Sequence, residues 1–278
     1  MRRGIPTHLV LASKSPARRA TLVAAGITPE VIVSHVDEPA VLAALPGGRA
    51  FSGGTTTPAD EVLALATAKC RAVAEGLEQG RPALTASAGA DRLVVVGCDS
   101  MLELDGRMLG KPHRPEVARE RIREMRNRAA VLWTGHFAVV LEPAGPGAVR
   151  PEGARPGGSA LGGSTLGGST LGGSAPDRAG TDAGPWTQVR EIGASASTTV
   201  RFGDMSDAEI DAYVDSGEPL KVAGSFTVDG LGGPFVTGIE GDYHSVVGLS
   251  LPLLRTMLTE VGVFWPDLWD HRRASSAR

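Results

Sequence analysis

The sequence has few cysteines, no long apolar run and no excess of positive charge, and each absence narrows what the protein can be. Only Cys70 and Cys98 occur in 278 residues, and they form neither a CxxC pair nor a disulfide framework, which predicts a protein of a reducing compartment. No stretch reaches the roughly 20 apolar residues of a membrane span. The net charge of −3 argues against a large nucleic-acid-binding surface but leaves room for a small basic pocket that binds a phosphorylated molecule.

Several well-known active-site signatures are also missing. The chain contains no Walker-type loop, no GxGxxG after an expected strand, no HExxH and no GxSxG, and its six histidines lack metal-ligand spacing. The first residues resemble a signal peptide, but their apolar stretch is short and Pro6 and His8 interrupt it. We therefore expect a cytoplasmic protein that binds neither nucleic acid nor membranes.

Apolar periodicity, helix caps and turn signals predict alternating strands and helices. Strands are expected at 9–12, 92–99, 130–142 and 186–202, with a hairpin at 101–110 that turns at Asp105 and Gly106. Helices are expected at 16–25, 59–79, 114–128, 206–217 and 249–262. This alternation is typical of the α/β class, and the charged 114–128 helix is expected to face solvent.

One segment departs from this pattern. From about Pro143 to Pro185 the chain is mostly Gly, Ser, Ala and Pro, and it contains the five-residue repeat of GGSALGGSTLGGSTLGGSA. This composition buries too little apolar surface to offset the entropy of ordering, and the period is too short for a packed repeat architecture. We expect a disordered insertion between two strands of a single domain spanning 1–278. Its expected role is a passive spacer, and a protein-interaction role is the alternative.

The stretch LVLASKSPARRATL, residues 9–22, predicts an anion site. A short strand leads through a polar loop to Ser15, which is suited to cap a helix that begins at Pro16. Arg18 and Arg19 in the first helical turn oppose the helix dipole, but an anion bound at the helix N-terminus makes them favourable. Guanidinium groups pair well with phosphate oxygens. The alternative is two exposed arginines beside a capping serine.

Four more charged residues are candidates for the same site. Asp99 ends an apolar strand, where ligands of α/β folds collect, and its carboxylate suits metal binding or activation of water; a turn residue is the alternative. Lys69 falls on the apolar stripe of the 59–79 helix, where it either meets an anion or extends to solvent. Lys111 in LGKP is either a further cation of the site or an exposed loop lysine. Glu38 in VDEP is a weak signal by itself.

Seven sequence blocks resemble the Maf family of nucleoside triphosphate pyrophosphatases, in the same order: ASKSPARRATL, VDEP, ATAKCRAVA, VVGCDS, LGKP, EPLKVAGSFTVDGLGGPFV and IEGDYHSVVGLSL. The resemblance covers nearly the whole chain outside the insertion. It implies an α/β fold with two lobes around a central cleft, similar to inosine triphosphate pyrophosphatases, and homodimers in many members. It also implies hydrolysis of a nucleoside triphosphate to the monophosphate and pyrophosphate with a divalent cation, Mg²⁺ or Mn²⁺. A house-cleaning role against modified nucleotides and a link to septum formation and cell-division arrest are attributed to the family.

The resemblance also implies roles for individual residues. Asp99, Glu38 and Lys69 are implied to be catalytic, and the two carboxylates also to bind the metal. Substrate binding is implied for Ser13, Arg18, Ser100, Lys111 and Asp229. Of these, Ser13 and Arg18 match the phosphate-binding loop and Asp229 matches a position that contacts the nucleobase.

Three positions depart from the common pattern of the family. Ala17 stands where many members carry arginine, Ser100 where threonine is common, and Asp229 where glutamine or glutamate is found. Because these positions are associated with nucleotide choice, the sequence leaves the nucleobase open. The alternative to an enzyme is a nucleotide-sensing regulator on the same fold. The acidic pair beside the cations favours the enzyme, because a binding protein has no need of it.

Overall fold

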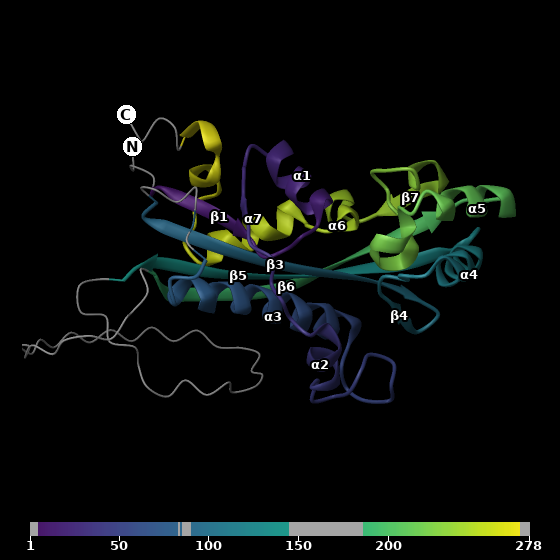
Figure 1. The fold of residues 1–278 in the computed structure, drawn as a ribbon, viewed down its shortest axis with the longest axis horizontal. Helices are drawn as coiled ribbons and strands as arrows, with labels where there is room; N and C mark the ends of the chain where they lie inside the picture. Colours follow the sequence, from purple (N-terminus) through teal and green to yellow (C-terminus); the bar gives the residue numbers. More distant parts are fainter. Residues whose placement is uncertain (1–4, 83, 85–89, 145–185, 273–278) are drawn as a thin grey trace, which may run out of the picture.

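The computed structural model describes residues 5–82, 84, 90–144 and 186–272, and it shows a seven-stranded mixed sheet with helices on both faces (Figure 1). The strands are β1 (Thr7–Leu11), β2 (Glu30–Val31), β3 (Arg92–Leu104), β4 (Arg107–Leu109), β5 (Ala129–Pro143), β6 (Trp186–Phe202) and β7 (Val236–Glu240). The α-helices are α1 (Pro16–Ala24), α2 (Glu38–Ala43), α3 (Pro58–Glu78), α4 (Pro115–Met125), α5 (Asp207–Asp215), α6 (Tyr243–Val247) and α7 (Leu251–Glu260). Short 3₁₀ helices are η1 (Pro219–Lys221), η2 (Ala223–Ser225), η3 (Gly233–Phe235) and η4 (Trp265–Leu268). The α/β class is confirmed, and residues 145–185 of the expected insertion lie outside the described residues.

The order of the strands leaves a gap along one edge of β3. The sheet runs β2-β1-β3-β5-β6-β7, with β1 parallel to β2 and β3 and the later pairs antiparallel, and β4 also pairs with β3. On this edge β1 pairs with β3 only as far as Val96, and β4 begins to pair at Leu102. Between these two points, no strand among the described residues pairs with this edge. The gap lies at Asp99.

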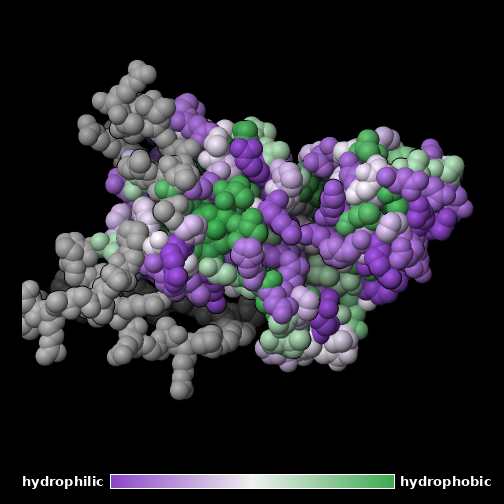
Figure 2. Space-filling model, viewed as in Figure 1, coloured by the Kyte–Doolittle hydropathy of each residue, from purple (hydrophilic) through white to green (hydrophobic). Residues whose placement is uncertain are grey.

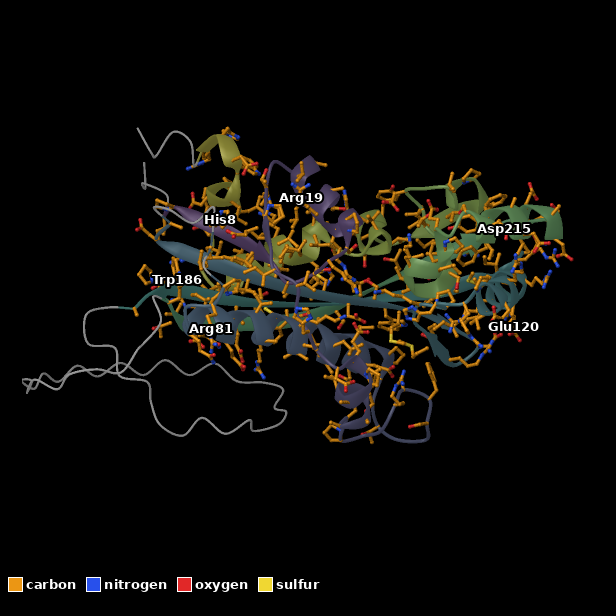
Figure 3. All side chains as sticks on the ribbon, viewed as in Figure 1. His8, Arg19, Arg81, Glu120, Trp186 and Asp215 are labelled. Atoms are coloured by element: carbon orange, nitrogen blue, oxygen red, sulfur yellow. The ribbon has the colours of Figure 1, made fainter. Side chains whose placement is uncertain are left out.

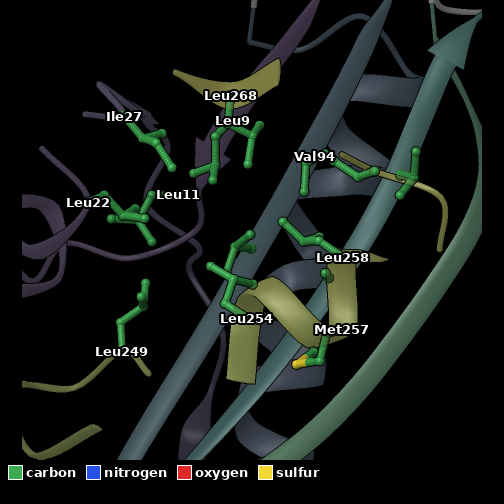
Figure 4. Close-up of a cluster of buried hydrophobic side chains, with 14 of the residues drawn as sticks. Leu9, Leu11, Leu22, Ile27, Val94, Leu249, Leu254, Met257, Leu258 and Leu268 are labelled. Atoms are coloured by element: carbon green, nitrogen blue, oxygen red, sulfur yellow. The ribbon is translucent and has the colours of Figure 1, made fainter. Parts of the chain in front are cut away.

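Each face of the sheet has its own hydrophobic cluster. On one face, Leu9, Leu11, Val94 and Val96 pack against α1 and α7 (Figure 4). On the other face, side chains such as Val10, Val95 and Val139 pack against α3. Successive side chains of a strand point to opposite faces. Asp99 therefore faces α3, whereas Cys98 and Ser100 face α1.

The two cysteines belong to different clusters. Cys98 lies in the cluster beneath α1 and α7, and Cys70 lies in the cluster beneath α3. Both thiols are buried and free. In this structure the two cysteines therefore form no disulfide with each other.

A third cluster joins the far ends of β3, β5 and β6 to α4 and α5. The charged face of α4 is turned outward, as the sequence predicts, and Arg119 forms ion pairs with Asp211 at 2.7 Å and Asp215 at 2.8 Å on α5. Figure 2 shows mostly hydrophilic residues at this end of the molecule. None of the helices among the described residues has the length and apolar character needed to cross a membrane.

The structure corrects one predicted boundary and adds elements that the sequence pattern did not predict. β3 does not end at Asp99 but continues to Leu104, because β5 pairs with it continuously from Leu93 to Glu103. The prediction that Asp99 ends its strand is therefore wrong, and Asp99 instead lies within β3, past the last residue that pairs with β1. The elements β2, α2, β7 and α6 were not expected. They are too short to show a periodic pattern.

Candidate active site

Lys69 reaches the sheet because α3 packs closely on it at two glycines. A Cβ atom at Gly97 would lie 2.4 Å from a backbone carbonyl oxygen of α3, and one at Gly135 would lie 2.3 Å from another. Any side chain at these positions would push the helix away. Gly135 is also the cross-strand partner of Asp99, and Gly97 precedes Asp99 by two residues on the same face. The close approach of α3 thus brings Lys69 to Asp99.

Two carboxylates converge on the Lys69 ammonium. Its Nζ lies 2.5 Å from Asp99 Oδ1 and 2.7 Å from Glu38 Oε1. The side chains of Lys69 and Asp99 are only 12% and 11% exposed, whereas Glu38 is 46% exposed. The structure therefore brings together the three residues that the resemblance implies to be catalytic.

The two carboxylates differ in their affinity for a proton. Burial raises the pKa of Asp99, although the charges of Lys69 and Arg18 oppose the increase. Partial burial also favours a higher pKa for Glu38, but the hydrogen bond and charge of Lys69, with Lys111 and Arg18, outweigh it and lower the Glu38 pKa. Neighbouring carboxyl groups with pKa values shifted in opposite directions are suited to separate proton-transfer and electrostatic roles.

Glu38 is held by the start of α2. The Asp37 side chain caps this helix by accepting a hydrogen bond from the Ala40 N–H at 3.0 Å, and Pro39 occupies the first turn. The sequence VDEP thus carries a helix-start signal that the sequence analysis did not use. Capping fixes Glu38 as the first residue of α2.

Lys111 follows β4 and contributes positive charge to the same region. Desolvation lowers the pKa of its ammonium. Glu38 and Asp99 oppose this effect, whereas Lys69 and Arg18 add to it. The charges of the cluster thus act on Lys111, although the residue is exposed.

Arg18 closes the gap in the sheet edge. Its Nη1 donates to the Cys98 carbonyl at 2.8 Å and to Ser13 Oγ at 3.1 Å. Its Nε donates to the Gly248 carbonyl at 2.8 Å, and its Nη2 donates to Ser100 Oγ at 3.1 Å. The guanidinium therefore ties α1 to β3 and to the turn between α6 and α7, a structural role that the sequence analysis did not predict.

The Ser100 hydroxyl belongs to a chain of buried hydrogen bonds. Ser100 Oγ lies 3.0 Å from Thr134 Oγ1, and Thr134 donates to the Ser245 carbonyl at 3.1 Å. Thr134 and Ser245 are fully buried. The sequence analysis missed Thr134 because a hydroxyl on a strand face gives no local signal of its partners.

Arg19 and Asp229 lie outside this cluster. Arg19 is exposed on α1 (Figure 3), and it is not among the cations that lower the pKa of Glu38, which are Lys69, Lys111 and Arg18. Asp229 is exposed and lines a separate depression of about 320 Å³ together with Ala17, Tyr243 and His244. Two of the three positions that depart from the family pattern therefore share one depression beside the first turn of α1.

The site offers few ligands for a metal ion. Within the described part of the chain, no group of three or more His, Cys, Asp or Glu side chains is placed to hold one. Glu38 and Asp99, which both contact Lys69 Nζ, supply carboxylate oxygens, which Mg²⁺ and Mn²⁺ prefer. Mg²⁺ sites commonly use one or two carboxylates and complete the coordination with water and substrate phosphates. This pair of carboxylates fits that pattern.

Comparison with known proteins places these features in a family. The family model described as Maf-like protein matches residues 8–151 and 181–261. A protein of Nocardia farcinica is 45% identical over 263 residues, which cover 95% of this chain and 97% of that protein. Proteins of Cutibacterium acnes and Streptomyces coelicolor are each 41% identical, over 95% and 94% of this chain and the same shares of their own lengths. All three relatives are named nucleoside triphosphate pyrophosphatase.

Proposed function

The chain belongs to the Maf family, and we propose from this that it hydrolyses a nucleoside triphosphate to the nucleoside monophosphate and pyrophosphate. The observation that carries the proposal is the Lys69 ammonium, which contacts the carboxylates of both Asp99 and Glu38. The charge of Arg18 favours a lower pKa for both carboxyl groups, and that of Lys111 a lower pKa for Glu38. A cluster of this kind suits the binding of a polyphosphate and the activation of water. The names of the relatives support the same reaction.

In the proposed reaction, Asp99 acts as the general base. Water attacks the α-phosphorus, and the bond from this atom to the oxygen that bridges to the β-phosphate breaks. Asp99 accepts a proton from the attacking water, and its raised pKa brings it closer to the range in which a carboxylate is an effective base. The pyrophosphate departs with the bond electrons, and the ammonium groups of Lys69 and Lys111 stabilise its negative charge.

A divalent cation, Mg²⁺ or Mn²⁺, would be held by Asp99 and Glu38. When bound, it would supply positive charge to the phosphate oxygens and lower the pKa of a coordinated water. Arg18 has a different task in the proposal. By bonding to Ser13, Cys98, Ser100 and Gly248, it holds the loop before α1 in place beside β3.

The base of the nucleotide is proposed to occupy the depression lined by Ala17 and Asp229. The small side chain of Ala17 leaves space there, and the exposed ring of Tyr243 offers a surface for stacking. An ionised carboxylate only accepts hydrogen bonds, so Asp229 suits a base edge that presents N–H groups. Guanine presents two adjacent N–H groups and is the proposed preference.

A pyrophosphate-release assay with Mg²⁺ tests the function over guanine, adenine, cytosine, uracil and thymine nucleoside triphosphates and their modified forms. Release of pyrophosphate, rather than of single phosphate, is expected, with guanine nucleotides turned over fastest. Turnover that favours another base would contradict the base assignment alone. Triphosphate binding without turnover on any nucleotide would contradict the enzyme and favour a nucleotide-sensing regulator.

A further inference from the structure

The segment between β2 and α3 includes Glu38, and two ion pairs join this segment to α3. Lys69 pairs with Glu38 at the start of α2, and Glu61 pairs with Arg49 after the end of α2. Glu61 and Lys69 are eight residues apart, which is slightly more than two helical turns, so they lie on the same side of α3. Residues 38–50 therefore run along one side of α3 and are held at both ends.

At the second attachment point the Glu61 carboxylate is fully buried, whereas the Arg49 side chain is 43% exposed. Glu61 has an exposed fraction of 0%, and its Oε1 accepts hydrogen bonds from Arg49 Nε at 2.8 Å and from Arg49 Nη2. Its Oε2 accepts a hydrogen bond from the Ala50 backbone N–H at 2.9 Å. A buried carboxylate is tolerated only when it is paired and hydrogen-bonded, and these three donors meet that requirement. A different side chain at position 49 would leave the buried Glu61 carboxylate with fewer hydrogen bonds. The ion pair is therefore specific to Arg49.

The contacts between these two points are weaker. Val41 and Leu42 of α2 pack on Val62, Leu65 and Met101, but none of the residues of α2 is fully buried. A helix of six residues has little stability by itself. The position of α2 therefore depends on the attachment of Glu38 at its start and on the attachment of Arg49, six residues past its end, to the fully buried Glu61 carboxylate.

We propose that Arg49 and Glu61 are positioning residues that hold α2 so that Glu38 stays against Lys69. The proposal rests on the proposed function, in that Glu38 takes part in the reaction. Glu61 lies roughly 12 Å from Lys69 along the helix axis, at 1.5 Å per residue, so it acts through α2. Without the Arg49 contact, Glu61 holds this chain only through the Ala50 N–H, and α2 is otherwise held by its partly buried packing and by the Glu38 ion pair itself. Glu38 then leaves Lys69 for part of the time.

A double-mutant cycle with Arg49→Gln and Glu38→Gln tests this coupling. Glutamine at 49 keeps an N–H donor for Glu61 but loses the charge and the fork of the guanidinium, and Arg49→Lys serves as the conservative variant. Arg201→Gln is the matched control, because Arg201 forms an exposed ion pair with Glu240 on another part of the sheet. For each protein we would measure kcat, KM, Tm and the hydrogen exchange of the α2 amides.

The expected result is a loss of kcat of about 10- to 100-fold in Arg49→Gln, the size of effect that misplacement of a reacting group causes. Arg49→Lys should recover part of this loss, and Arg201→Gln should match the wild type. In the Glu38→Gln background, Arg49→Gln should cost no further activity, because the group that it positions is already gone. The α2 amides should exchange faster in Arg49→Gln while the amides of α3 keep their protection.

An equal loss of kcat in both backgrounds would overturn the proposal, because Arg49 would then act independently of Glu38. Where Glu38→Gln loses activity, unchanged kcat in Arg49→Gln would overturn it as well. If Glu38→Gln itself keeps full activity, the proposed role of Glu38 in the reaction fails, and hydrogen exchange alone decides the inference. Faster exchange of α2 in Arg49→Gln would then support the positioning of Glu38, and unchanged exchange would refute it.

Discussion

Lys69 and Asp99 form an ion pair across the interface between α3 and β3, with Lys69 Nζ 2.5 Å from Asp99 Oδ1 and both side chains nearly buried. Neither charge is well solvated by water, so each depends on the other. Glu38 adds a second carboxylate to the same ammonium. The three residues proposed to be catalytic therefore also hold one another in place, and substitutions at this site are expected to change both activity and stability.

Replacement of Asp99 by asparagine removes the proposed general base while preserving its shape. We expect kcat for pyrophosphate release to fall at least about 100-fold, the usual contribution of a positioned base. The Tm should show that the fold survives. Near-normal turnover would exclude Asp99 from the mechanism.

Replacement of Lys69 by methionine removes the cation that Asp99 and Glu38 share. The buried Asp99 carboxylate then has no positive partner at this position and still has Glu38 nearby. The free energy of unfolding at pH 7 should fall by about 3 kcal/mol, as measured by urea denaturation, because a buried charge loses its partner. Adding Asp99→Asn should restore most of the lost stability but none of the activity. A double variant no more stable than Lys69→Met would show that the ion pair is not the source of the effect.

Replacement of Gly97 by alanine should separate α3 from the sheet. The new Cβ would lie 2.4 Å from a carbonyl oxygen of α3, and overpacking of this kind costs about 1–3 kcal/mol of stability. Because α3 carries Lys69, kcat should fall as well. Gly238→Ala is the control, since its Cβ would find its nearest neighbour at 3.5 Å. Equal behaviour of the two variants in Tm and kcat would contradict the importance of the close approach.

His136 should make stability depend on pH. The ring is fully buried, its Nε2 accepts a hydrogen bond from the Ser250 N–H at 2.8 Å, and burial lowers its pKa to about 4, with Arg18 adding to the effect. Because the pKa of His136 in the folded state lies below the ordinary value of 6.5, the unfolded state binds a proton more readily than the folded state. The free energy of unfolding is therefore unaffected by the titration of this residue above pH 6.5 and decreases as the pH falls from 6.5 toward 4.

The loss should amount to about 3 kcal/mol between pH 6.5 and pH 4. Urea unfolding at pH 7, 5.5 and 4 measures it in the wild type and in His136→Gln, which lacks the titrating ring. A flatter profile is expected for the variant. Parallel profiles would assign the acid sensitivity to other groups.

Deletion of residues 145–184 tests whether the insertion is a passive spacer. Pro143 and Trp186 are cross-strand partners at the ends of β5 and β6, so a short turn such as Asn-Gly can join the strands. The family model also leaves residues 152–180 unmatched. We expect kcat within about twofold of the wild type, because a segment of this composition has little apolar surface to contribute to a core. Loss of activity at an unchanged Tm would favour an interaction role.

The sequence by itself determined the local structure. Ser15 and Pro16 start α1, the apolar stripe of α3 predicts its length and includes Lys69, and Asp105 with Gly106 forms the turn between β3 and β4. These features depend on neighbouring residues and on the periods of helix and strand, which are visible in the order of the residues. The order of the motifs along the chain also predicted the family correctly.

Only the tertiary structure decided how these elements meet. Pairing with β5 extends β3 past Asp99, close contact at Gly97 places Lys69, and the capping of α2 and its packing on α3 place Glu38. Arg18 donates a hydrogen bond to the Gly248 carbonyl, 230 positions away in the sequence, and Arg49 donates to the Glu61 carboxylate on α3. The choice of such partners depends on which surfaces pack together and on which buried groups need hydrogen bonds, and local sequence patterns carry neither kind of information.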